Sequence, residues 1–198
     1  MKTIQEKTWK GKFGVNYSIR NKGIKKNFLR KIIDKKIKIK SVFEFGTNIG
    51  NNLDIIKSIN KKTLTSGVEI NQFASEIARK KGHKIINKSI FELENAKKKF
   101  DLTMTIGVLI HVNPHQLKFI YKKLFEYSKK YILICEYFND KPVTIKYRGK
   151  FNLLFKRDFA KEIKDKYNLK IVDYGFVWSE DKNYNMDNYN WFLLKKKY

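Results

Sequence analysis

Short apolar runs alternate with longer helix-like stretches from residue 41 onward, and this alternation limits the chain to few folds. The predicted strands are 42–45, 64–70, 84–87, 100–106 and 131–137, and the predicted helices are 51–59, 71–81 and 114–127. Pro114 suits the first turn of the last of these helices, where no N–H is needed. Such a βαβα order predicts a parallel sheet covered by helices on both faces.

Both ends of the chain depart from this order. Residues 22–38 carry apolar side chains at helical spacing among lysines, which predicts an amphipathic helix with a basic outer face. After a helix at 157–167, strand-like runs at 169–177 and 189–194 predict an antiparallel hairpin that closes the sheet. No repeat or linker divides the chain, so we expect a single domain of 198 residues, with residues 1–40 as a helical cap or lid.

A glycine-containing turn follows the first predicted strand. Gly46 and Gly50 would let a ligand approach the backbone at the strand end where doubly wound sheets bind nucleotides. Glu69 ends the next strand about 20 residues on, where a carboxylate accepts hydrogen bonds from both ribose hydroxyls. The dinucleotide fingerprint G-x-G-x-x-G is not met, because Asn48 takes its middle glycine position. An acidic residue, Glu44, stands two positions before Gly46.

This order, an acidic residue and a glycine after the first strand and an acidic residue after the second, resembles the S-adenosylmethionine site of class I methyltransferases. The resemblance implies an α/β fold. The expected fold is a Rossmann-like, doubly wound, mostly parallel sheet of seven strands with an antiparallel C-terminal hairpin. It also implies S-adenosylmethionine as cofactor and methyl donor.

Five segments, four of them outside this pattern, are similar to methyltransferases associated with pseudaminic acid biosynthesis. They are WKGKFGVNYSIRN (9–21), GTNIGNNL (46–53), EYFN (136–139), YRG (147–149) and LFKRDF (154–159). Together they extend over nearly the whole chain. The resemblance implies carbohydrate modification, with a methyl group transferred to a hydroxyl, in preference to an amine, of a nonulosonic acid sugar or of its precursor or activated form.

The methyltransferase resemblance also places residues around the cofactor. Ser89 and Ile90, after the third strand, correspond to the adenine contact, and Ser89 replaces an acidic residue often found there. Gly107 leaves room for the sulfonium end. Tyr17 and Arg20 are expected to fold over the donor, Arg20 near the methionine carboxylate, unless the N-terminal helix merely packs on the sheet. The predicted cofactor-binding residues are Tyr17, Arg20, Glu44, Gly46, Asn48, Gly50, Asn52, Glu69, Ile70, Ser89, Ile90, Ile106, Gly107 and Val108.

His111 and Glu136 are the two candidates for the catalytic base. His111 lies just beyond the fourth strand, and an imidazole with an ordinary pKa near 6.5 suits proton removal from an acceptor hydroxyl. Glu136 ends the fifth strand at the same edge of the sheet. A structural role is the alternative for each residue, so the sequence leaves the base unassigned.

The acceptor pocket is expected in the loops after the fifth strand. An arginine pairs with a carboxylate through two parallel hydrogen bonds, which favours Arg148 and Arg157 over any single lysine for an acidic sugar. A helix cap or a pair with Asp158 is the alternative for Arg157. The predicted substrate-binding residues are Tyr137, Tyr147, Arg148, Lys156 and Arg157.

The charge of the chain first suggests a nucleic-acid partner. There are 44 Lys and Arg against 19 Asp and Glu, a formal net charge of +25. Only five of the cations are arginines, and the lysines are scattered among Ile and Asn, as A/T-rich codons would produce in any protein. An RNA or DNA methyltransferase and a non-catalytic basic binding module remain the alternatives. The N-P-P-[YFW] motif of base-amino methyltransferases is not met at residues 113–115, which argues against the former.

The cysteine count, the apolar runs and the metal-ligating residue types predict the compartment and the metal content. Cys135, the single cysteine, lies in an apolar run, which excludes an internal disulfide and indicates a reduced compartment. No stretch approaches the ~20 apolar residues of a membrane span, and the N-terminus lacks a signal-type run. No cluster of His, Cys, Asp and Glu has metal-ligand spacing. We expect a soluble cytoplasmic protein that binds no metal; the oligomeric state stays open.

Overall fold

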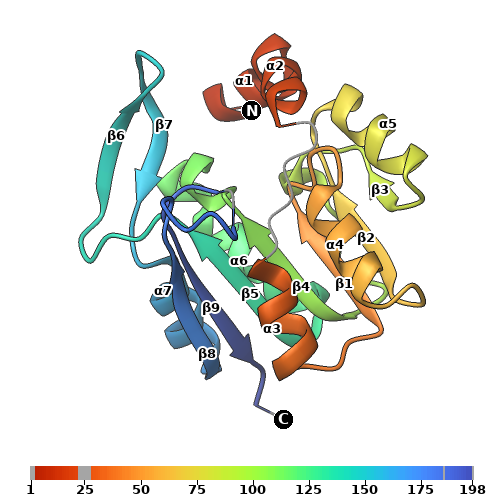
Figure 1. Ribbon diagram of the computed structural model, residues 1–198. Helices are drawn as coiled ribbons and strands as arrows, with labels where there is room; N and C mark the ends of the chain where they lie inside the picture. Colours follow the sequence, from red (N-terminus) through yellow and green to blue (C-terminus); the bar gives the residue numbers. More distant parts are fainter. Residues whose placement is uncertain (1–2, 22–27, 185, 198) are drawn as a thin grey trace.

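The computed structural model describes residues 3–21, 28–184 and 186–197. The main sheet contains β1 (Ser41–Phe45), β2 (Leu64–Val68), β3 (Lys84–Ile86), β4 (Phe100–Ile106), β5 (Ser128–Glu136), β8 (Lys170–Val177) and β9 (Tyr189–Lys195). Their spatial order is β3-β2-β1-β4-β5-β9-β8 (Figure 1). The first five strands are parallel, whereas β9 runs antiparallel to β5 and β8 antiparallel to β9. The predicted fold class, including the C-terminal hairpin, is confirmed.

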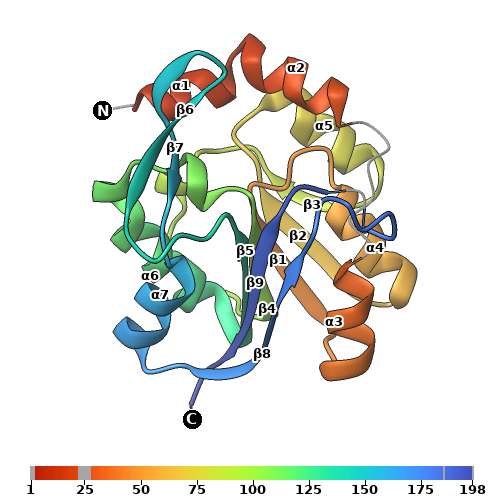
Figure 2. The same ribbon diagram turned by 60° about the vertical axis from the view of Figure 1, so that its left-hand side comes forward.

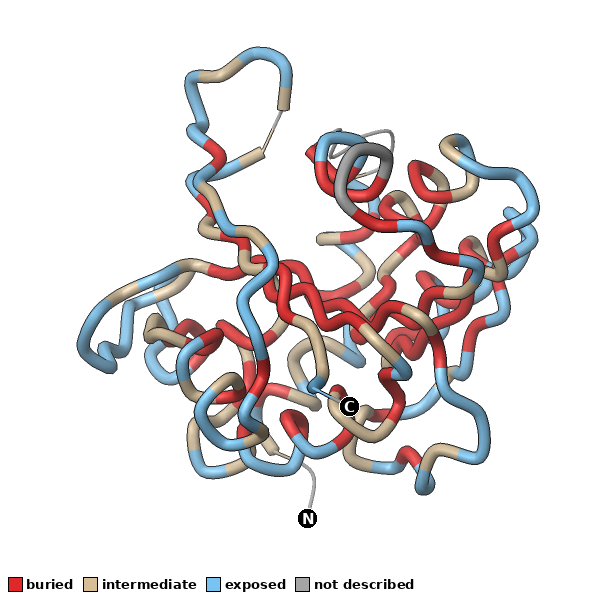
Figure 3. The backbone as a smooth tube through the Cα atoms, turned by 90° about the horizontal axis from the view of Figure 1, so that it is seen from below, coloured by how far each residue is buried: buried red, intermediate tan, exposed pale blue. Residues whose placement is uncertain are grey.

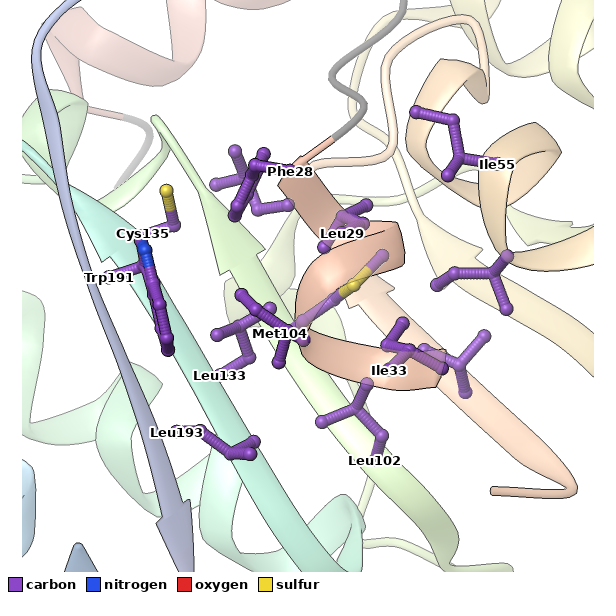
Figure 4. Packing of buried hydrophobic residues seen from close by; sticks show 14 of the residues in the cluster. Phe28, Leu29, Ile33, Ile55, Leu102, Met104, Leu133, Cys135, Trp191 and Leu193 are labelled. Atoms are coloured by element: carbon purple, nitrogen blue, oxygen red, sulfur yellow. The ribbon is translucent and has the colours of Figure 1, made fainter. Parts of the chain in front are cut away.

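Helices cover both faces of this sheet, and successive residues of each strand point to opposite faces. The covering helices are α3 (Phe28–Lys36), α4 (Asn51–Ile59), α5 (Gln72–Lys80), α6 (Leu117–Tyr127) and α7 (Phe159–Tyr167). Leu133 of β5 packs with α3 and α4 in one core, and its neighbour Ile132 packs with α6 and α7 in the other. Figure 4 shows Leu29 and Ile33 of α3 directed at the strands. Buried residues gather along the central strands (Figure 3).

The predicted cap at residues 1–40 has two parts in the structure. Helices α1 (Ile4–Lys10) and α2 (Lys12–Arg20) lie over the carboxyl ends of the parallel strands, next to α5 (Figures 1 and 2). The helix predicted at 22–38 is found as α3, which packs on a face of the sheet; residues 22–27 lie outside the described residues.

A second hairpin occupies the region where the sequence predicted only loops. It consists of β6 (Val143–Tyr147) and β7 (Lys150–Lys156) and stands apart from the main sheet (Figure 2). Arg148 and Gly149 at its turn have φ angles of 49° and 79°. Two consecutive positive φ angles are typical of the turn that joins strands through two residues. The alternating apolar residues of β6 were the sequence signal for this strand.

Local sequence sets several element boundaries. The predicted helix 51–59 and strand 100–106 coincide with α4 and β4. Helix α7 begins after Asp158, whose side chain accepts a hydrogen bond from the amide of Lys161 at 2.8 Å, as an N-cap does. Cys135 is fully buried in β5. Within the described part of the chain, none of the helices combines the length and apolarity needed to cross a bilayer.

Candidate active site

The loop from β1 to α4 borders a cavity of about 170 Å³ at the carboxyl ends of the parallel strands. Gly46 and Gly50 have φ angles of +72° and +82°, a region that favours glycine. A Cβ atom at Gly46 would lie 2.5 Å from Cγ2 of Val108, so a side chain does not fit between the β1 and β4 loops. Asn48 has a φ of 49°, which asparagine tolerates. The predicted turn is present, with Asn48 at its centre.

Glu44 and Asn52 form a buried pair beneath this loop. Nδ2 of Asn52 donates to Oε1 of Glu44 at 2.6 Å, and Glu44 is fully buried. Asn52 lines the cavity, and its buried Oδ1 has no hydrogen-bond donor among the described residues. Glu44 therefore anchors the first turn of α4, while Asn52 keeps a buried acceptor in the cavity wall that is without a partner in the described part of the chain.

Glu69, directly after β2, joins two loops of the site. Its Oε2 accepts a hydrogen bond from the amide of Asn48 at 2.7 Å, and its Oε1 accepts one from the amide of Asn71 at 2.8 Å. Burial raises the pKa of Glu69, and the backbone amides of Asn71, Asn48 and Ile70 lower it in part. A carboxylate has about four acceptor positions, so Glu69 keeps capacity for ligand hydroxyls at the cavity wall.

Helices α1 and α2 form the roof of the cavity. Nδ2 of Asn71 donates to the carbonyls of Trp9 and Lys10 at the end of α1, at 3.0 and 3.3 Å. Oγ of Ser18 in α2 donates to Oδ1 of Asn48 at 2.7 Å. The two bonds from Asn71 satisfy carbonyls that the end of α1 leaves free. The roof is thus bonded to the loops that follow β1 and β2.

The roof also contacts the loop that follows β3. Oγ of Ser89 donates to Oε1 of Glu6 at 2.6 Å, and the amide and hydroxyl of Thr3 donate to Oε2 of Glu6 at 2.9 and 3.2 Å. Burial raises the pKa of Glu6, but the hydrogen bonds from Ser89 and Thr3 outweigh this, and the net pKa lies below its ordinary value. Glu6 is therefore an ionised carboxylate at neutral pH, beside Ser89 in the cavity wall.

Most of the predicted cofactor-binding residues come together around this cavity. Its lining includes Tyr17, Gly46, Asn48, Asn52, Glu69, Ile70, Ser89, Ile90, Ile106, Gly107 and Val108. Glu44 and Gly50 lie behind the wall, and Arg20 is exposed on α2. Gly107, with a φ of +67°, leaves no room for a Cβ, which would lie 2.6 Å from the hydroxyl of Tyr189.

The ring of His111 lines the cavity from the short 3-10 helix η2 (Leu109–His111). Its Nδ1 lies 2.6 Å from the carbonyl oxygen of Leu153 in β7. Because a carbonyl only accepts, Nδ1 carries the proton and Nε2 is left with its lone pair. The rings of Trp9 and Tyr147 lie 4.6 and 5.2 Å from the imidazole, centroid to centroid. Burial lowers the pKa of His111 to about 4, so the imidazole is neutral at pH 7.

Glu136 lies at the end of β5 but does not line this cavity. Its Oε1 accepts hydrogen bonds from the amides of Val108 and Leu109, both at 3.1 Å, and from the hydroxyl of Thr105 at 2.9 Å. Burial raises the pKa of Glu136 to about 7, although these bonds lower it in part. In this arrangement Glu136 fixes the start of the helix that carries His111.

The five predicted substrate-binding residues do not gather at this cavity, and two of them, Tyr137 and Arg157, line a separate one. None of the five lines the first cavity, and Tyr147 reaches it through the ring of His111. The guanidinium of Arg148 lies 5.8 Å from the Tyr147 ring centroid at the exposed hairpin turn. Nε of Arg157 lies 3.0 Å from Oε1 of Glu162. Nζ of Lys156 stands 5.3 Å from the ring centroid of Tyr137, whose hydroxyl donates to Oδ2 of Asp187 at 2.6 Å.

The cavity is poor in positive charge although the chain carries a net charge of +25. Its described lining includes the carboxylates of Glu6 and Glu69 and contains no Lys or Arg. Within the described residues there is no group of three or more His, Cys, Asp or Glu placed to hold a metal ion.

Sequence reasoning missed Glu6, Asn71 and Gln116 as residues of the site. Asn71 had a local signal, because it follows Glu69 closely and precedes a predicted helix, whose N-cap it forms by accepting from the amide of Ala74 at 3.2 Å. Glu6 and Gln116 had no local sequence signal, because only the fold brings the N-terminal roof and the start of α6 to the cavity.

Solved structures of methyltransferases share this fold. Magnesium protoporphyrin IX methyltransferase from Synechocystis, with bound SAH, aligns with a TM-score of 0.69 at 12% identity and covers 98% of each chain. A SAM-dependent methyltransferase from Leishmania major aligns with a TM-score of 0.66 at 17% identity, covering 96% of this chain and 81% of that one. One from Methanosarcina mazei gives 0.65 at 14% identity, over 83% and 96%.

The chain therefore has the fold of class I methyltransferases. At these identities the likeness establishes the fold alone. No protein-family model matches the sequence, and no curated protein matches it.

Proposed function

We propose that this chain is a methyltransferase that uses S-adenosylmethionine. The observation that carries the proposal is the position of Glu69 at the end of β2, in a cavity bordered by the glycine turn after β1. That is where a doubly wound sheet binds the ribose of a nucleotide cofactor. Neighbours of the same fold support the choice of cofactor, since the Synechocystis enzyme and the plantazolicin methyltransferase were solved with SAH.

Three buried side-chain oxygens of the cavity wall fit such a ligand. Oε1 of Gln5, Oδ1 of Asn52 and Oε1 of Gln116 have no hydrogen-bond donor among the described residues. A buried acceptor without a partner costs about 1–3 kcal/mol of folding free energy. S-Adenosylmethionine offers matching donors, namely its ammonium group, its two ribose hydroxyls and its adenine amine.

The residues that would hold the cofactor follow the strand order. Glu69 would bind the ribose hydroxyls, the loop with Gly46 and Asn52 would bind the methionine part, and Gly107 with its neighbours would face the sulfur. When bound, the cofactor supplies an electrophilic methyl group on a positively charged sulfur. The roof formed by α1 and α2 excludes water from this space.

His111 is proposed as the base that accepts the proton of the acceptor hydroxyl. Its Nε2 has a lone pair, because the carbonyl of Leu153 holds the proton at Nδ1. The rings of Trp9 and Tyr147 fix the plane of the imidazole. Glu136 is proposed as a positioning residue, since its carboxylate is engaged with the amides beneath His111.

For the acceptor, we propose a hydroxyl of a nonulosonic acid sugar or of its activated form. This rests on the sequence resemblance to the pseudaminic acid-associated methyltransferases. With no cation in the described lining, the sugar carboxylate would lie outside the cavity, beside Arg148 at the hairpin turn. The two carboxylates of the lining disfavour an RNA or DNA strand in the same space.

The cofactor proposal is tested by calorimetry with S-adenosylhomocysteine. Wild type should bind it, and Glu69→Ala should weaken binding about 30-fold or more, because charge-assisted hydrogen bonds to the ribose are lost. Glu76→Ala, on the exposed side of α5, is the control and should bind like wild type. Absence of binding by the wild type would rule out the cofactor.

The acceptor proposal is tested with labelled S-adenosylmethionine and intermediates of nonulosonic acid synthesis. One intermediate should become labelled, and Arg148→Ala should raise its KM about tenfold with little change in kcat, because it removes a carboxylate partner. Lys150→Ala, on the same hairpin, is the matched control. Label found in RNA or DNA, and in no sugar, would favour the nucleic-acid alternative.

A further inference from the structure

One carboxylate of the cavity has no role in the function proposed above. Glu6 belongs to α1, and yet its Oε1 is bonded to Ser89, 83 residues away, at 2.6 Å. The other oxygen accepts from Thr3 in a capping box that starts α1. One carboxylate thus joins the N-terminal helix to the loop after β3, and both residues face the cavity.

The strand order determines what lies next to this carboxylate. Since β3 is the neighbour of β2, the loop after β3 flanks Glu69 on the side away from β1. Nδ2 of Asn87 donates to the carbonyl of Glu69 at 2.8 Å, which ties the two loops together. With the ribose at Glu69, the base of the nucleoside extends towards Ser89. The side chains of Ile70 and Ile90 line the cavity there and offer apolar surfaces to a flat ring.

Adenine has an exocyclic amine, which is a hydrogen-bond donor and would face this wall. The serine hydroxyl has one proton, and that proton is already given to Glu6. Among the acceptors of this wall, the carboxylate of Glu6 carries a negative charge and is bonded to the loop after β3, whereas the amide oxygens of Gln5 and Gln116 are neutral. An ionised acceptor binds an N–H donor about twice as strongly as a neutral one.

We propose that Glu6, held by Ser89, recognises the adenine amine, so that the N-terminal helix supplies the specificity for the base of the cofactor. This inference rests on the proposed function. It makes closure of α1 over the sheet and recognition of the base a single event, because the same carboxylate takes part in both. A cofactor analogue with a carbonyl in place of the amine would present an acceptor to an acceptor and be rejected.

The test compares calorimetric binding of S-adenosylhomocysteine with that of its analogue in which hypoxanthine replaces adenine. Wild type should prefer the adenine compound by tenfold or more. Glu6→Gln should bring the ratio of the two dissociation constants close to one, since an amide offers both a donor and an acceptor. Glutamine also serves at this position of a capping box, so α1 keeps its first turn.

Glu92→Gln is the matched control. Oε2 of Glu92 accepts from the amide of Ser89 at 2.9 Å, but Glu92 does not line the cavity, so the ratio should stay at the wild-type value. Equal weakening of both ligands by Glu6→Gln would mean that Glu6 only fastens the helix, and would overturn the inference. An unchanged ratio would do the same. If wild type binds neither ligand, the cofactor proposal itself fails.

Discussion

The imidazole of His111 is held by residues from three separate elements. The carbonyl of Leu153 comes from β7, the Trp9 ring from α1 and the Tyr147 ring from β6. The carbonyl sets the tautomer and the two rings set the plane, while burial lowers the pKa of the ring against the opposing effect of the Leu153 hydrogen bond. A neutral imidazole in a fixed tautomer is ready to accept a proton without first losing one.

The pH dependence of methyl transfer distinguishes His111 from Glu136 as the base. His111 has a pKa of about 4, so kcat/KM should be flat from pH 8 down to about pH 5.5 if it is the base. Glu136 has a pKa of about 7, and as the base it would lose activity about tenfold by pH 6. A pH–rate profile measures the difference.

The same shift also affects folding stability. A folded pKa below the unfolded value of about 6.5 means that the unfolded chain binds the proton more tightly. The contribution of neutral His111 to stability is therefore complete above pH 6.5 and is lost as the pH falls towards 4. The fraction of folded protein must be measured at each pH of the rate profile, so that acid unfolding is not mistaken for protonation of the catalytic base.

At the scale of elements, the roof formed by α1 and α2 is predicted to act as a lid, and several contacts fasten it to the loops of the sheet. Asn71 makes the central contacts, because it caps α5 with its oxygen and binds the carbonyls of Trp9 and Lys10 with its nitrogen. Close packing reinforces the contact. A Cβ at Gly14 would lie 2.8 Å from Nδ2 of Asn71 and 1.9 Å from the carbonyl oxygen of Trp9.

Substitution of Asn71 should release the lid selectively. Asn71→Asp keeps an oxygen for the amide of Ala74 but replaces the donor to the α1 carbonyls by a negative charge. We expect backbone amides of α1 and α2 to exchange with deuterium about tenfold faster or more, whereas those of α5 stay protected. Native-state hydrogen exchange by mass spectrometry measures this.

Asn71→Ala provides the comparison, because it removes both functions and should loosen α5 as well. If Asn71→Asp leaves the exchange of α1 and α2 at the wild-type rate, this side chain does not fasten the lid.

At the scale of the whole molecule, the cavity does not share the positive charge of the chain. The chain has a net charge of +25, while the described cavity lining contains two carboxylates and no cation. The net charge of the chain therefore does not predict the charge of the cavity lining. The first suggestion of the charge, a nucleic-acid partner, finds no counterpart in the cavity.

Local sequence patterns predicted most of the fold. The boundaries of α4 and β4 follow from hydrophobic spacing, and the C-terminal hairpin follows from two β-rich runs around a polar segment. The hairpin of β6 and β7 was missed although β6 alternates apolar residues, because β6 is exposed along nearly its whole length and only Leu153, Leu154 and Phe155 of β7 are buried. Its turn at Arg148 and Gly149 was the better signal.

The candidate site also has a part that the sequence predicted and a part that stays a prediction. The glycine turn and Glu69 were readable because the ends of neighbouring parallel strands meet at one edge, whatever else the chain does. The catalytic roles of His111 and Glu136 and the carboxylate role of Arg157 stay predictions. In the structure Glu136 binds backbone amides and Arg157 pairs with Glu162.

The sequence by itself determined the order of strands and helices, the glycine turn and the acidic residue after β2, because these depend on residues close together along the chain. Only the tertiary structure decided which carboxylate stands beside Ser89 and which carbonyl sets the tautomer of His111. Those contacts join residues 83 and 42 positions apart. No local periodicity encodes such pairs, since they form only when the lid and the hairpin pack against the finished sheet.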